Sequence, residues 1–78
     1  MLTHSQIWGA LDSIAHSKNI SVSQLAIISG LDPTAFNKSK RTDINGKLRY
    51  PSTHTLLKVL NKNNITITTF AKLCDQVK

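Results

Sequence analysis

The chain has 78 residues, 40% of them hydrophobic, so it is long enough for one small folded domain and too short for two. Ten Lys and Arg residues against four Asp and no Glu give a formal net charge of +6, and the single cysteine excludes an internal disulfide. The apolar fraction is not that of a disordered chain, and no apolar run approaches the length of a membrane-spanning helix.

A repeated pattern marks the expected start of each helix. A Ser, Thr or Asp stands at the N-cap position, with an apolar residue before it and another four positions after it. This is the spacing of the hydrophobic staple, which fixes the angle at which the chain enters a helix. The pattern occurs at Thr3, Ser21, Asp32, Ser52 and Thr66, and therefore predicts five short helices.

The apolar periodicity sets the bounds of these helices. We expect them at about 5–17, 22–29, 33–41, 53–61 and 67–76. Pro33 suits the first position of the third helix, where the missing N–H of proline is not needed. A polar, basic loop at about 42–50 contains the turn dipeptide Asn45-Gly46. The sequence therefore predicts an all-α, five-helix domain over 1–78.

Residues 22–41 have the spacing of a helix-turn-helix unit. Ala26 is small enough to lie where two helices cross at a steep angle, and Gly30 suits the positive φ of the sharp turn between them. Phe36 is placed to fill the wedge between the two helices. The pattern predicts a DNA-binding unit in which residues 33–41 form the helix that enters the major groove.

The distribution of charge favours the same partner. Five of the ten cations lie between residues 38 and 49: Lys38, Lys40, Arg41, Lys47 and Arg49. Such a cluster indicates a polyanion, most simply nucleic acid. The alternative is a solvated loop whose charges only maintain solubility.

A family resemblance rests on two sequence blocks, Ser-Gly-Leu-Asp-Pro-Thr-Ala-Phe-Asn-Lys-Ser-Lys-Arg at 29–41 and Arg-Tyr-Pro-Ser-Thr at 49–53. They resemble the N-terminal DNA-binding domain of phage-type repressors of the lambda repressor/Cro class, the XRE-like regulators. The closest resemblance is to those that carry a LexA-like peptidase domain downstream. The resemblance covers essentially the whole chain.

This resemblance implies a lambda-repressor-like fold and a transcriptional regulator that represses by binding palindromic operators in double-stranded DNA as a homodimer. Residues 1–78 would be the N-terminal piece of a longer repressor or a stand-alone regulator. The dimer would form through the helix at 67–76 or through an absent C-terminal domain, in which case the isolated domain would be monomeric. The protein would be bacterial or phage-encoded and would act in the cytoplasm, at the nucleoid.

The chemistry of the recognition segment separates base readers from phosphate anchors. Hydrogen-bonding side chains on the exposed face of a helix at 33–41 suit base edges: Thr34, Asn37, Lys38 and Arg41. Cations, hydroxyls and an amide elsewhere suit phosphates: Gln24, Lys40, Lys47, Arg49, Ser52 and Thr53. Each has a structural alternative. Asn37 could form a local cap, the lysines could be solvated, and Ser52 is first a helix cap.

Other functional classes find less support in the sequence. His4, His16, His54 and Cys74 lack the spacing of a zinc site, so we expect no metal and no cofactor. No Gly-rich phosphate loop or catalytic constellation stands out, so we do not expect an enzyme. The remaining alternative is a protein-interaction or antitoxin-like module on the same helical fold, which would need an exposed apolar patch.

Overall fold

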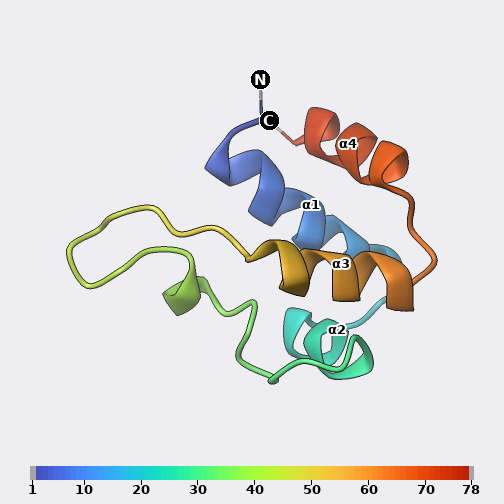
Figure 1. Ribbon diagram of the computed structural model, residues 1–78, viewed down its shortest axis with the longest axis horizontal. Coiled ribbons are helices and arrows are strands. Elements are labelled where there is room, and N and C mark those ends of the chain that lie inside the picture. Colours follow the sequence, from blue (N-terminus) through green and yellow to red (C-terminus); the bar gives the residue numbers. More distant parts are fainter. Residues whose placement is uncertain (1, 78) are drawn as a thin grey trace.

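α1 crosses the centre of the molecule and packs against both α4 and α2, while α2 also packs against α3 (Figure 1). The computed structural model describes residues 2–77, in which the α-helices are α1 (His4–Ser17), α2 (Val22–Ile28), α3 (Thr53–Lys62) and α4 (Ile67–Gln76). A short 3₁₀ helix, η1, spans Lys38–Lys40. The described chain is thus all-helical, apart from one isolated antiparallel bridge between Thr42 and Leu48.

Four of the five predicted N-caps begin α-helices. The side-chain oxygen of each cap accepts the backbone N–H three residues later, at 3.1–3.2 Å. These caps are Thr3, Ser21, Ser52 and Thr66. At Thr3 the Gln6 side chain completes the reciprocal bond of a capping box, whereas Gln24 does not do so at Ser21.

Three helices end in the same way. A residue with positive φ follows the C-cap of α1, α2 and α3: Asn19 (φ 57°), Gly30 (φ 78°) and Asn64 (φ 56°). The N–H of the next residue then bonds back to the carbonyl five residues earlier, at 3.1, 2.9 and 2.8 Å respectively. These are Schellman motifs, and each places a half-buried apolar side chain, Ile20, Leu31 or Ile65, against the core.

The fully buried apolar residues come from the four α-helices described and from Phe36 outside them. The largest fully buried side chains include Phe36, Leu11, Leu25 and Val59. Phe36 and Ala26 are both buried, as expected for the turn between two crossing elements. Trp8 is 3% exposed and packs edge-on against Phe36.

The predicted α-helix at 33–41 is wrong. Residues 33–36 form a single turn, and Asn37 has an extended backbone with φ −62° and ψ 150°. Only the three residues of η1 follow it. The structure therefore has four α-helices among residues 2–77 where the sequence predicted five, and a helix-turn-helix with a helical second arm does not form there.

Two physical reasons account for this ending. After Phe36 the sequence supplies Asn37 and then Lys-Ser-Lys, so a longer helix would bury no further apolar side chain, and a short helix without a packed face is marginal. In addition, the Arg41 guanidinium donates to the Phe36 carbonyl at 3.0 Å, the acceptor that a continuing helix would use for the Lys40 N–H.

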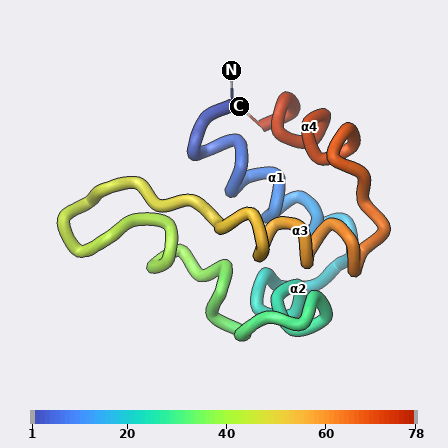
Figure 2. Tube along the Cα trace, in the orientation of Figure 1, coloured from blue at the N-terminus to red at the C-terminus, as the bar shows by residue number. Residues whose placement is uncertain are grey.

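A long arm joins η1 to α3 and extends away from the helices (Figures 1 and 2). Its outer part is a hairpin, which we call the basic hairpin, spanning residues 42–48. The Asp43 N–H bonds to the Lys47 carbonyl at 2.8 Å, and the Gly46 N–H closes the turn on the Asp43 carbonyl at 3.0 Å. Gly46 has φ 81°, so the predicted Asn45-Gly46 turn is present.

Candidate nucleic-acid interface

The arm is fastened to α1 by Arg41. Its guanidinium forms a bidentate ion pair with Asp12, at 2.7 and 2.9 Å, and lies 4.9 Å from the centre of the Trp8 ring. The Arg41 side chain is only 13% exposed, and its Nε is buried without a hydrogen-bond partner. The guanidinium of Arg41, which the sequence assigned to base readout, is therefore engaged within the domain.

Two further bonds hold the root of the arm. The Trp8 indole N–H donates to the Arg49 carbonyl at 2.9 Å. His4 Nε2 lies 2.7 Å from the Arg41 carbonyl, a bond that requires the Nε2–H tautomer. The His4 ring also packs edge-on against Tyr50, at 5.3 Å between ring centres. The two chain segments that enter and leave the basic hairpin are therefore both bound to α1.

The turn at 33–36 presents polar groups in a different arrangement from a helix. Thr34 is exposed, and both its hydroxyl and its N–H donate to Asp32 Oδ1, at 2.6 and 2.8 Å. These two bonds, with the nearby Lys40 charge, lower the pKa of the Asp32 carboxyl. The Thr34 hydroxyl proton is thus engaged locally, and its methyl group and remaining lone pair are what it can offer a base.

The other two expected base readers stay near the surface. Asn37 is half-buried and forms no side-chain cap on η1, so the local capping role does not occur. Lys38 is exposed on the first residue of η1. Together with Thr34, they occupy a turn and a 3₁₀ helix rather than one continuous helical face.

The residues expected to contact phosphates divide into three places. Lys47 and Arg49 are exposed on and beside the basic hairpin, and Lys40 is exposed at the end of η1. Ser52 and Thr53 are exposed at the start of α3, where Ser52 also caps the helix. Gln24 is exposed in the first turn of α2.

Charge pairing leaves the cations of the arm free. Among residues 2–77 the one ion pair joins Arg41 to Asp12. Lys38, Lys40, Lys47 and Arg49 therefore have no described carboxylate within ion-pair distance. The nearest carboxylate in sequence, Asp43, accepts the N–H groups of Asn45 and Lys47 at 2.8 Å each. The arm is consequently a surface of positive charge.

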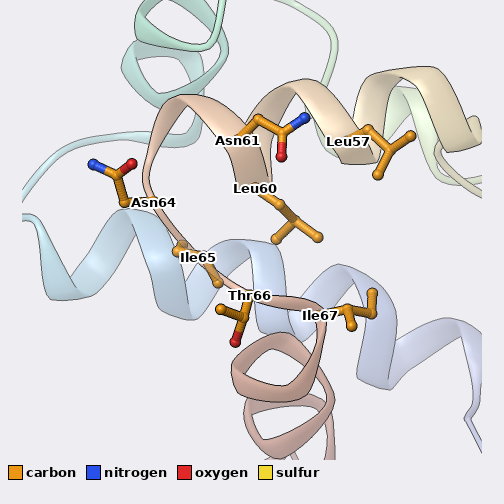
Figure 3. A pocket seen from close by; sticks show the side chains of 7 residues that line it. All are labelled: Leu57, Leu60, Asn61, Asn64, Ile65, Thr66 and Ile67. Carbon is orange, nitrogen blue, oxygen red and sulfur yellow. The ribbon is translucent and has the colours of Figure 1, made fainter.

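A separate groove lies between α3 and α4, with a volume of about 560 Å³ (Figure 3). Figure 3 shows the side chains of Leu57, Leu60 and Ile67 around it, with the amide of Asn61 at its edge. Leu57 and Ile67 are about half or more exposed, at 48% and 64%. Ile27 and Ile28 on α2 are exposed too, at 54% and 49%. The described surface thus carries apolar side chains that the sequence did not reveal.

The described residues contain no group of three or more His, Cys, Asp or Glu side chains placed to hold a metal ion. Cys74 is fully buried in α4, and burial raises the pKa of its thiol. Within residues 2–77, no helix has both the length and the apolar character needed to cross a bilayer.

Sequence reasoning missed the residues that position the arm. The sequence pattern assigns no role to Asp12, and it brings in His4 only as a residue without the spacing of a zinc site. One signal was available, because Trp8 and Asp12 are four residues apart and so share a helix face. Nothing in the local sequence marks the pairing of that face with Arg41, which lies 29 residues from Asp12.

Comparisons of the chain with protein-family models, with curated proteins and with solved structures found no match.

Proposed function

We propose that this domain binds double-stranded DNA through polar and cationic side chains between Thr34 and Thr53, and through Gln24 of α2. The observation that carries the proposal is a set of exposed cations without described carboxylate partners, located on η1 and on or beside a hairpin whose root is bound to α1: Lys38, Lys40, Lys47 and Arg49. Phosphate contacts supply most of the affinity of such proteins. We assign phosphate contacts to three cations and to three neutral hydrogen-bond donors: Lys40, Lys47 and Arg49, and Gln24, Ser52 and Thr53.

Base readout falls to the residues of the turn and η1. The amide of Asn37 has the donor and acceptor needed for adenine, and the ammonium of Lys38 suits the acceptors of guanine. The methyl group of Thr34 suits a thymine methyl. Arg41 is withdrawn from this set, and its role becomes that of holding the arm in position for the others.

The resemblance to phage-type repressors extends the proposal to a transcriptional repressor that binds a palindromic operator as a dimer. A second copy would meet the first at the surface beside α4, where Leu57 and Ile67 are exposed. Two recognition segments would then lie about one DNA turn apart, roughly 34 Å.

The alternative, a protein-interaction module, gains support from the exposed isoleucines of α2, Ile27 and Ile28. The two proposals differ in the salt dependence of binding that they predict. Binding through several phosphates weakens steeply with salt, with a slope of about −0.9 per phosphate on a logarithmic plot. Apolar docking on α2 has no such dependence.

The test is a gel-shift salt titration on duplexes selected from a random pool, with two matched variants. We expect Lys47→Ala to weaken binding to all sequences alike and to reduce the salt slope by about 1. We expect Asn37→Ala to relax preference at one base position while the slope stays unchanged. The number of protein copies per duplex in the shifted complex shows whether the domain binds as a dimer.

Three outcomes would count against the proposal. An affinity that does not change with salt concentration, or no binding to any duplex, would contradict DNA as the partner. A uniform loss of affinity in both variants would contradict the assignment of Asn37 as a base reader. Binding of one copy per selected site would contradict the proposal that the domain binds DNA as a dimer.

A further inference from the structure

The basic hairpin ends in an apolar side chain. Ile44 is 99% exposed, far more than the neighbouring exposed apolar residues Leu48 (52%) and Tyr50 (56%). A single exposed apolar side chain on a protein surface needs no explanation. Three features of its surroundings distinguish Ile44 from such a residue. They are the hydrogen-bonded turn, the neighbouring cations and the anchored root of the hairpin.

The turn that carries Ile44 is held in one shape. Asp43 Oδ1 accepts the N–H groups of Asn45 and Lys47, and the Asp43 carbonyl accepts the N–H of Gly46. Ile44 is the first residue after Asp43, so it stands at the outer corner of this turn. A side chain on a braced corner is presented outward without the ordering cost that a flexible loop would pay.

Cations flank the tip. Lys40, Ile44 and Arg49 line the same shallow depression between η1 and the hairpin. Asp43 contributes the one carboxylate there, and its Oδ1 is engaged with the backbone. Lys47 adds a further positive charge three residues beyond the tip. The apolar tip therefore borders a depression that two cations share with one carboxylate, with a third cation near it in the sequence.

The root of the hairpin resists displacement. Arg41 at its start is paired with Asp12, and the Arg49 carbonyl at its end accepts the Trp8 indole N–H at 2.9 Å. Both ends of the hairpin are therefore held against α1.

We propose that Ile44 is a wedge that enters the minor groove of duplex DNA, with Lys40, Lys47 and Arg49 on the phosphates that border it. This inference rests on the proposed function. The minor groove is about 6 Å wide, which admits a side chain at a hairpin tip but no helix. Isoleucine is among the apolar side chains that separate base steps from this groove, and cations are attracted to its negative potential. A wedge at this position bends the DNA.

The test compares Ile44→Ser with Leu48→Ser on a selected duplex labelled at both ends for energy transfer. Leu48 lies on the same hairpin away from the tip, so it controls for loss of an exposed apolar side chain. We expect Ile44→Ser to lower affinity about tenfold, the effect of losing one buried side chain, and to straighten the DNA, with the salt slope unchanged. Leu48→Ser should bind and bend like the wild type. Netropsin, a minor-groove ligand, should compete with the wild type and much less with Ile44→Ser.

The fluorescence of Trp8, the single tryptophan, confirms that each variant is folded. If Ile44→Ser binds and bends DNA like the wild type, the wedge is overturned while DNA binding stands. If Ile44→Ser changes self-association in sedimentation and leaves the DNA complex unaltered, the tip docks on a second copy and the wedge is again overturned. If the wild type binds no duplex at any salt concentration, both the wedge and the proposed function fail.

Discussion

Arg41 makes three contacts through one guanidinium. It pairs with Asp12 of α1, donates to the carbonyl of Phe36 and lies over the ring of Trp8. A planar guanidinium can make two parallel bonds to a carboxylate while a further N–H reaches a carbonyl, which an ammonium group cannot reproduce. The positive charge of this residue is therefore used for the architecture of the arm.

The Arg41–Asp12 pair should contribute measurably to folding stability. Asp12 remains 44% exposed while Arg41 is 13% exposed, so the pair lies between an exposed and a buried salt bridge. We expect a double-mutant cycle of Arg41→Ala and Asp12→Ala to give a coupling of about 1–2 kcal/mol. The measurement is urea unfolding followed by Trp8 fluorescence.

The conservative variant Arg41→Lys separates charge from geometry. We expect it to recover less than half of that coupling, because lysine cannot make the bidentate pair. Full recovery would show that the charge alone matters and that the guanidinium geometry does not.

The helix ends follow one design at the element scale. α1, α2 and α3 each end in a Schellman motif, and the residue with positive φ is asparagine twice and glycine once. Glycine and asparagine are the residues that tolerate this conformation best. The same local chemistry therefore ends three helices and aims three apolar side chains at the core.

Gly30 offers a clean measurement of this effect. A Cβ at this position would meet nothing within 4 Å, so the cost of a side chain is purely conformational. We expect Gly30→Ala to lower the free energy of unfolding by about 1 kcal/mol. Gly30→Asn should cost less, because Asn19 and Asn64 already occupy equivalent positions. Chemical denaturation of both variants measures whether Gly30→Asn loses less unfolding free energy than Gly30→Ala. Equal losses would show that asparagine has no advantage over alanine in this backbone conformation.

At the scale of the whole molecule, the core and the arm are distinct. The four helices bury Cys74 and the large apolar side chains, while the arm is exposed and joined to them by a few polar contacts. The core rests on apolar burial, whereas the position of the arm rests on these polar contacts, and Trp8 takes part in both. A variant can change the arm while the helices remain folded.

The titration of the buried Cys74 thiol links the stability of the core to pH. Burial raises the pKa of its thiol, so the folded state retains the proton at pH values where the unfolded chain begins to lose it. Its contribution to stability is present below the ordinary thiol pKa and declines as pH rises above it. We expect the difference in stability between the wild type and Cys74→Ala to shrink between about pH 8 and 10. A difference that stays constant with pH would show that the folded thiol titrates normally.

The sequence by itself determined four helix starts, because a cap is a contact between residues three apart. It also determined the Gly30 turn and the burial of Ala26 and Phe36, from the spacing of these residues. It located the cluster of cations at 38–49. Each of these depends on neighbours along the chain.

Only the tertiary structure decided the conformation of the chain after Phe36. Local patterning favoured a helix through Arg41, but no apolar face remained for it to bury, and the Arg41 guanidinium took the carbonyl that the helix needed. The partner of that guanidinium, Asp12, lies on another helix, and no local pattern specifies such a pairing. Long-range contacts of this kind converted an expected recognition helix into a turn and an arm braced against α1.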